Sequence, residues 1–244
     1  MNLVIDLGNT RAKLALFEGK VLKEQFSFEP RISLVQLQKV FKNHPGINKT
    51  IVSSVINHSK DISNFLSNHT QHILFDSNTK IPVQNKYGSP ETLGKDRLAA
   101  AIGAYSMYKN IPVLIIDAGT CIKTDVVTAK GEYLGGSISP GINMRFKALN
   151  QFTDKLPVLN IDNNYHSLTG NNTNESILSG VQNGALFEVK GFIDGYLKQY
   201  PELKIVLTGG DAAFFELELK NHIFVCPELV LIGLNEIVEF NASK

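Results

Sequence analysis

The chain has 244 residues, of which 43% are hydrophobic and 19% charged, and its formal net charge is +1. This is the composition of a globular protein long enough for two domains, and a near-neutral charge without a basic stripe argues against nucleic acid as a partner. Apolar runs such as Val113–Ile116 are too short to span a bilayer, and the opening residues contain no targeting signal, so we expect a cytoplasmic protein without a membrane anchor.

The first 109 residues alternate short strands with helices. Apolar runs bounded by turn residues predict a meander of three strands, and spacing of three to four between apolar residues predicts the helices that follow. The expected strands are 3–7, 12–17, 21–28, 50–55 and 73–75, and the expected helices are 33–43, 59–68 and 94–109, with a loop over 76–93.

The chain then begins the same pattern again. The strand that opens the chain ends in Asp6-Leu7-Gly8-Asn9-Thr10, and an apolar strand from residue 113 ends in Asp117-Ala118-Gly119-Thr120. A second strand at 124–127, a Lys130-Gly131 turn and a third strand reaching Gly135-Gly136 follow. Because the two Asp residues lie about half a chain apart, we interpret the pattern as a duplication of one fold.

The remaining residues complete the second copy. We predict helices at 142–151, 176–200, 212–220 and 228–240, strands at 204–208 and 222–226, and a long loop over 157–175. The prediction is therefore two α/β halves, residues 1–112 and 113–244, each a mixed sheet of about five strands flanked by helices.

The two Asp-Gly-Thr turns have the chemistry of phosphate binding. A carboxylate at the end of a strand can hold Mg²⁺ or its waters, and a glycine lets backbone N–H groups approach an anion. Two such turns facing each other across a cleft would clamp a polyphosphate, which is most of what phosphoryl transfer requires. The alternative is that each turn only closes a hairpin. The sequence contains no Walker A motif and no protein-kinase glycine-rich loop.

Five motifs together resemble the type III pantothenate kinases, within the acetate kinase/sugar kinase/Hsp70/actin superfamily. They are D-L-G-N-T-R-A-K (6–13), G-K-D-R-L-A-A (94–100), D-A-G-T (117–120), G-G-S-I-S-P-G (135–141) and T-G-G-D-A (208–212). The resemblance covers nearly the whole chain. It implies two duplicated actin-like (ribonuclease H-like) α/β domains with the active site in the cleft. It also implies ATP-dependent phosphorylation of pantothenate to 4′-phosphopantothenate, which begins coenzyme A synthesis.

The resemblance also implies a role for each matching residue. Asp96 would be the base, Asp117 would bind a monovalent cation (K⁺ or NH₄⁺), and Asp6 would lie near the Mg²⁺ that accompanies ATP. The ATP and phosphate ligands would be Asp6, Leu7, Gly8, Asn9, Thr10, Arg11, Ala12, Lys13, Thr120, Gly209 and Gly210. The pantothenate ligands would be Tyr87, Gly94, Lys95, Asp96 and Arg97, with Thr173 reaching in from the second subunit of a homodimer with shared active sites.

Several of these residues have a structural alternative. Asp96 in a first helical turn also complements the helix dipole, Arg97 is alternatively a solvated charge, and Thr173 is alternatively a helix N-cap. Two positions depart from the family, in which many members carry Ala where Cys121 stands and Thr where Lys123 stands. A Lys on this hairpin either contacts phosphate or points outward. The rival functions are a sugar or acyl kinase of the superfamily and a non-catalytic relative such as a Bvg accessory factor.

Overall fold

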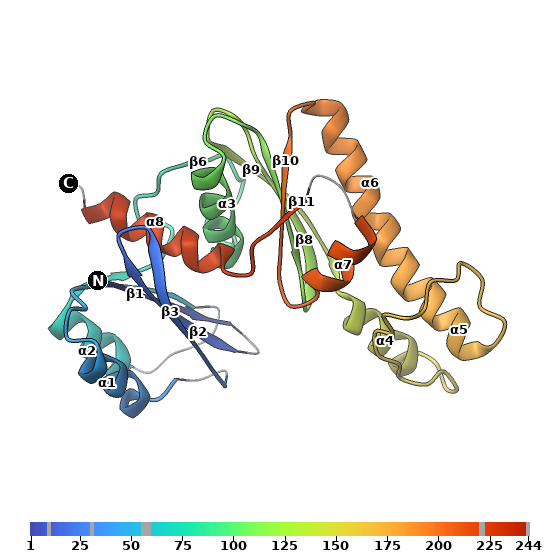
Figure 1. Cartoon of the computed structure of the whole chain (residues 1–244), viewed down its shortest axis with the longest axis horizontal. Coiled ribbons are helices and arrows are strands. Elements are labelled where there is room, and N and C mark those ends of the chain that lie inside the picture. Colours follow the sequence, from blue (N-terminus) through green and yellow to red (C-terminus); the bar gives the residue numbers. More distant parts are fainter. Residues whose placement is uncertain (9–10, 30–31, 55–59, 220–222, 243–244) are drawn as a thin grey trace. The chain divides into compact units, whose positions relative to one another are not determined.

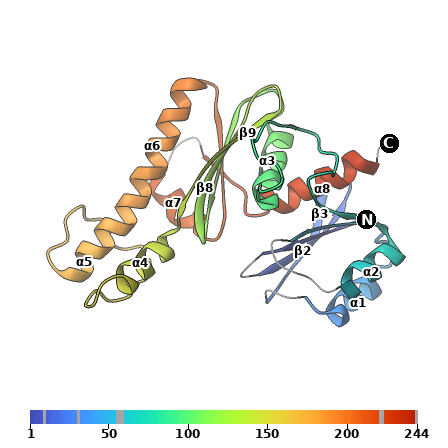
Figure 2. The same cartoon turned by 180° about the vertical axis from the view of Figure 1, so that it is seen from behind.

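The structure is a computed structural model that describes residues 1–8, 11–29, 32–54, 60–219 and 223–242. It divides into two compact units, shown in Figures 1 and 2. Unit 1 comprises Met1–Lys109, Gly131–Tyr133 and Glu228–Lys244, and unit 2 comprises Asn110–Lys130 and Leu134–Pro227. Within the described ranges, no helix is long and apolar enough to cross a membrane.

Unit 1 is built on a five-stranded sheet in the order β3-β2-β1-β4-β5. β1 pairs antiparallel with β2 and parallel with β4, which in turn pairs parallel with β5. The strands are β1 (Asn2–Leu7), β2 (Ala12–Glu18), β3 (Val21–Phe28), β4 (Lys49–Ser54) and β5 (Gln71–Leu74).

The two faces of this sheet carry different helices. Side chains alternate along β1, so Leu3, Ile5 and Leu7 pack in the core that includes residues of α1 (Leu34–Asn43) and α2 (Lys60–His69). Asn2, on the opposite face, donates a hydrogen bond of 2.8 Å to Asn235 of α8 (Leu229–Ala242). Asp6 shares the face of Asn2 and therefore points away from the core of α1 and α2.

Helix α8 packs closely on α3 (Lys95–Met107), and the two lie side by side in Figures 1 and 2. Glycines form the crossing. A Cβ added to Gly233 would lie 1.8 Å from the carbonyl oxygen of Ala99, and one added to Gly103 would lie 2.5 Å from that of Leu229. Since no side chain fits in these spaces, the backbones touch, and α8 fixes the position of α3.

The sheet that runs through unit 2 has the same core order. Its order is β11-β10-β7-β8-β9-β6, so β9-β8-β7-β10-β11 repeats the sequence of connections found in unit 1. β7 pairs antiparallel with β8 and parallel with β10. The strands are β7 (Val113–Ala118), β8 (Cys121–Val127), β9 (Glu132–Pro140), β10 (Lys204–Thr208) and β11 (Ile223–Val225), with β6 (Gln84–Asn85) paired to the first two residues of β9.

Helices cover one face of β7 in unit 2. Leu114, Ile116 and Ala118 pack in a core with residues of the helices, whereas Asp117 alternates to the other face. The long helix α6 is the orange helix of Figure 1. The helices are α4 (Ile142–Gln151), α5 (Thr173–Leu178), α6 (Gly184–Gln199) and α7 (Ala212–Leu219), and a π-helical segment (Ser179–Asn183) joins α5 to α6.

The predicted mixed α/β fold with a duplicated meander is confirmed by these two sheets. Three local details differ. The loop predicted over 76–93 contains the two-residue strand β6, and the helix predicted from 176 starts at Thr173 and includes the π-helical segment. The sequence-based division at residue 112 assigned residues 228–244 to the second half, whereas their packing groups them with unit 1.

Candidate active site

The first hairpin, between β1 and β2, presents Asp6 and Lys13 beside a tight turn. These two residues lie directly opposite each other on the antiparallel strands, and both are half-buried. The Gly8 N–H donates to the Arg11 carbonyl across the turn at 3.1 Å. Asn9 and Thr10 lie outside the described residues. Leu7 and Ala12 are buried in the core, so these two expected ligands can offer only backbone groups.

The second hairpin, between β7 and β8, repeats this arrangement. Asp117 lies opposite Lys123, and the Lys123 Nζ is 2.6 Å from the Asp117 Oδ2. The Gly119 N–H donates to the Cys121 carbonyl at 3.0 Å, which leaves Thr120 exposed at the tip. The ion pair of Lys123 with Asp117 was not predicted, although an outward or phosphate-facing Lys123 was considered.

Two further segments of unit 2 pack against this second turn. The Gly141 N–H donates to the Thr120 carbonyl at 3.1 Å, and a Cβ on Gly141 would lie 2.0 Å from the Gly119 oxygen. Gly209 adopts a φ of 98°, and its Cβ would lie 2.1 Å from the Ala118 oxygen. Only glycine fits at either position. The structure therefore brings Asp117, Thr120 and the Gly209-Gly210 turn together, and adds Gly141, which was not named as a ligand.

Asp211 follows the Gly209-Gly210 turn. Its N–H donates to the Ala118 carbonyl at 2.9 Å, which ties the turn to the end of β7. Burial raises the pKa of the Asp211 carboxyl above its ordinary value, because a partly desolvated carboxylate is less stable in the charged form.

Unit 1 holds a second cluster, at the start of α3. Arg97 is buried, with 5% of its surface exposed, and its guanidinium carbon lies 5.7 Å from the centre of the Tyr87 ring. Strand β6 places Tyr87, since the neighbouring Lys86 N–H donates to the Tyr133 carbonyl at 2.9 Å. The Tyr87 ring also approaches that of Tyr133, with centres 6.2 Å apart. A buried guanidinium beneath an aromatic ring excludes the alternative of a solvated helix charge.

Asp96 lies in the first turn of α3, next to Arg97. A Cβ on Gly94 would come within 2.7 Å of the Asp96 Oδ1, so glycine at the N-cap makes room for the carboxylate. Lys95 opens the helix and is half-buried. The cluster of Tyr87, Gly94, Asp96 and Arg97 thus combines a carboxylate, a guanidinium and an aromatic face within one unit.

Thr173 is exposed at the first position of α5. The N-cap of that helix is Asn172, whose side-chain oxygen accepts the Glu175 N–H at 3.0 Å. The alternative that Thr173 itself caps the helix is therefore wrong, which leaves its hydroxyl for another role.

The comparisons with known proteins agree with these motifs. A family model described as type III pantothenate kinase matches residues 2–195. A protein named type III pantothenate kinase from Christiangramia forsetii is 42% identical over 100% of both chains, and one from Phocaeicola vulgatus is 44% identical over 99% of both. The chain belongs to the type III pantothenate kinase family.

Solved structures support the fold of this kinase. A putative N-acetylmannosamine kinase from Listeria monocytogenes has a TM-score of 0.61 at 13% identity over 99% of both chains. A structure described as a putative Baf family transcriptional activator from Campylobacter jejuni has a TM-score of 0.59 at 21% identity, over 99% of this chain and 100% of the other. At these identities the similarity shows the fold alone.

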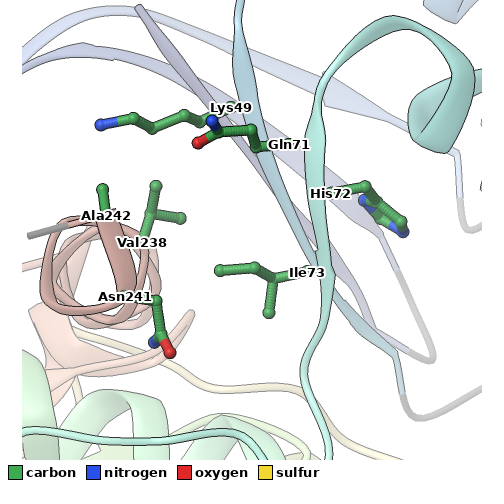
Figure 3. Close-up of a pocket in the computed structure, with 7 residues that line it drawn as sticks. All are labelled: Lys49, Gln71, His72, Ile73, Val238, Asn241 and Ala242. Carbon is green, nitrogen blue, oxygen red and sulfur yellow. The ribbon is translucent and has the colours of Figure 1, made fainter. Parts of the chain in front are cut away.

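A hollow elsewhere in unit 1 is distinct from the residues expected to bind ligand. Figure 3 shows it beside β5 and the end of α8, and it has a volume of about 160 Å³. Ligand pockets usually measure about 300–1,000 Å³, so this hollow is too small for the nucleotide of a kinase. It is lined by Lys49, Gln71, His72, Ile73, Val238, Asn241 and Ala242, none of which is an expected ligand.

Proposed function

We propose that this family member transfers the γ-phosphate of ATP to the terminal hydroxyl of pantothenate. The product is 4′-phosphopantothenate, the first intermediate of coenzyme A synthesis. The observation that carries the proposal is full-length similarity to proteins named for this activity, at 42–44% identity. The repeated Asp-bearing hairpins support it, because phosphoryl transfer depends on positioning and charge neutralisation.

Arg97 is the proposed ligand of the pantothenate carboxylate. A guanidinium binds a carboxylate through two parallel hydrogen bonds and keeps its charge when buried. Tyr87 holds the guanidinium by a cation–π contact, which is stronger when desolvated. Gly94 and Lys95 complete this pocket at the start of α3.

Asp96 is the proposed base. As the hydroxyl oxygen of pantothenate forms its bond to the γ-phosphorus, the bond from that phosphorus to the bridging oxygen of ATP breaks, and ADP leaves. The hydroxyl proton moves to the Asp96 carboxylate. The adjacent Arg97 holds the substrate whose hydroxyl must reach this carboxylate.

The two hairpins are the proposed phosphate loops. The backbone N–H of Arg11 in the first hairpin and that of Thr120 in the second would approach the phosphates, and Gly209 and Gly210 would lie on the adenosine side. Asp6 suits Mg²⁺, since this ion accepts one carboxylate and keeps several waters. When bound, Mg²⁺ neutralises phosphate charge.

The monovalent cation expected at Asp117 fits this chain less well. The Asp117 carboxylate already carries the Lys123 ammonium at 2.6 Å. A potassium ion at the same oxygen would have to displace that ammonium or lie against it. The proposed reaction therefore includes no step that uses a bound monovalent cation.

A homodimer with shared active sites remains part of the proposal. Unit 2 exposes apolar side chains on β9 and α6, namely Leu134 (42%), Ile138 (60%) and Phe187 (53%). Contiguous apolar patches are typical of protein interfaces, and these side chains are the candidates for such a patch. Thr173 is also exposed, as a residue that reaches a second subunit must be.

Replacing Asp96 by Asn tests the mechanism. Asn cannot take up the proton, so kcat in a coupled kinase assay should fall by roughly 10²–10⁴-fold. Asp61→Asn is the matched control, because Asp61 occupies the first turn of α2. Both variants lose a favourable helix-dipole interaction of about 0.3–1 kcal/mol. An equal kcat in the two variants would reduce Asp96 to that structural role.

A substrate panel separates the rival functions. Pantothenate, pantetheine and several sugars are supplied with ATP and Mg²⁺. Turnover of pantothenate alone supports the proposal, and turnover of a sugar would identify a sugar kinase of the same fold. An absence of turnover with every substrate would favour a non-catalytic relative.

A further inference from the structure

The ion pair between Lys123 and Asp117 lies in the middle of the second phosphate loop. The two residues are directly opposite on β7 and β8, with 2.6 Å between Nζ and Oδ2. Only 17% of the Lys123 side chain and 19% of the Asp117 side chain are exposed. The ammonium is therefore held against one carboxylate oxygen in a largely enclosed place.

The other carboxylate oxygen lies close to the backbone at Gly209. Thr208 lies opposite Asp117 on the parallel strand β10, and the chain turns there through Gly209. A Cβ on Gly209 would lie 2.6 Å from the Asp117 Oδ1. Lys123 thus contacts one oxygen of the carboxylate, and the Gly209 backbone crowds the other.

A negative Asp117 beside a polyphosphate needs a positive charge between them. Uncompensated, the carboxylate would repel the anion, and the low dielectric of an enclosed site strengthens that repulsion. An ammonium has three N–H donors and can bridge a carboxylate and a phosphate oxygen. A second cation at the same carboxylate would be repelled by Lys123.

The first hairpin places the same two residue types opposite each other. Asp6 and Lys13 are directly opposite on β1 and β2, as Asp117 and Lys123 are on β7 and β8. Each Asp that faces a phosphate loop therefore has a lysine across the strand pair. This repetition shows that the lysine is a feature of both hairpins of the duplicated fold.

We infer that Lys123 is a built-in replacement for an exchangeable monovalent cation, so that nucleotide binding and turnover need neither K⁺ nor NH₄⁺. The inference rests on the proposed kinase activity. Lys123 binds the nucleotide phosphates through its charge, and Asp117 positions that charge.

The test compares cations in solution. Wild-type rates should agree within about twofold in K⁺, NH₄⁺, Na⁺ and tetramethylammonium chloride at equal ionic strength. Lys123→Ala should lose roughly 10²-fold in tetramethylammonium, a loss comparable with removal of one donor to a developing phosphate or oxyanion charge. K⁺ or NH₄⁺ should restore much of that loss by occupying the vacated side of Asp117. Lys123→Arg should remain independent of the cation.

Lys130→Ala is the matched control, because Lys130 is exposed in the turn after β8. It should behave as the wild type does in every salt. A wild-type enzyme that loses at least tenfold in rate on replacing K⁺ by tetramethylammonium would overturn the inference. So would a Lys123→Ala variant that matches the wild type in tetramethylammonium.

A binding measurement keeps this inference separable from the proposed activity. Titration calorimetry with Mg²⁺ and a non-hydrolysable ATP analogue needs no pantothenate. Equal wild-type affinity in K⁺ and tetramethylammonium, with a K⁺-dependent affinity in Lys123→Ala, supports the inference even when pantothenate is not turned over. Potassium-dependent affinity in the wild type refutes it. If Lys123→Ala does not fold, the wild-type salt series and Lys123→Arg decide.

Discussion

Replacing Gly233 by Ala should destabilise unit 1 and weaken pantothenate binding. The added carbon would lie 1.8 Å from the Ala99 carbonyl oxygen, whereas ordinary contact begins near 3.4 Å. The obstacle is backbone, which cannot rotate away as a side chain can. Helices α3 and α8 would therefore have to separate by more than an ångström.

Two effects of this substitution oppose each other. Ala is favoured over Gly within a helix by roughly 0.8–1 kcal/mol, whereas overpacking costs about 1–3 kcal/mol and more when the backbone must move. Because the clash is with backbone, we expect overpacking to dominate and the free energy of unfolding to fall by about 1–2 kcal/mol. Displacement of α3 also moves Arg97, two residues before Ala99, so the KM for pantothenate should rise.

Gly184→Ala is the control for this prediction. Gly184 is helical, and a Cβ there meets no atom within 4 Å. This variant should gain up to about 1 kcal/mol, with KM unchanged. Urea unfolding followed by circular dichroism and steady-state kinetics provide the two measurements. A Gly233→Ala protein as stable as Gly184→Ala, with the wild-type KM, would refute the reasoning about the helix crossing.

Three further predictions concern residues of the proposed site. Tyr87→Leu should raise the KM for pantothenate by about 2- to 30-fold, the range of a cation–π contact, whereas Tyr87→Phe should not; equal KM values for the two variants would contradict the ring's role. Thr173→Val should weaken pantothenate binding. If sites are shared, refolding this variant together with Asp96→Asn gives heterodimers in which one site carries both changes and the other carries neither, so random pairing should restore about a quarter of wild-type sites. Activity no higher than the parental average, with subunit exchange shown, would exclude a shared site. Because the pKa of Asp211 is raised, the folded state keeps the proton on this carboxyl at pH values above 3.8, where the unfolded state has lost it. The free energy of unfolding should therefore fall as pH rises from 3.8 through the pKa of the folded state. Asp211→Asn should flatten that fall in urea titrations at several pH values, and an unchanged slope would contradict it.

Much of the fold could be predicted because the strands and helices carry strong periodic patterns. The strands that end near Asp6 and Asp117 led to the prediction of a duplicated fold, and the same strand order in both sheets confirms that prediction. Strand β6 could not be predicted in this way. Two residues show no alternation, and their pairing depends on Glu132 and Tyr133, which lie far along the chain.

The sequence motifs name the candidate site residues, but the contacts of these residues could not be predicted. The motifs led to Asp96 and Arg97, yet the burial of Arg97 under Tyr87 depends on β6. The pairing of Asp117 with Lys123 follows from the register of β7 and β8, and a one-residue shift would move Lys123 to the opposite face. Sequence alone does not specify that register, because it also depends on the conformation of the turn between the strands.

Helix α8 has a consequence for the order in which the protein folds during synthesis. Its Asn235 bonds to Asn2 and to the Gly19 carbonyl, so the last helix completes a sheet whose strands leave the ribosome first. One face of the sheet of β1 to β5 therefore stays uncovered until residue 242 has emerged from the ribosome. Most of unit 2 is contiguous in the chain and can fold earlier. A fragment of residues 1–112 would expose the apolar surface that α8 covers, and aggregation is the expected fate of such a surface.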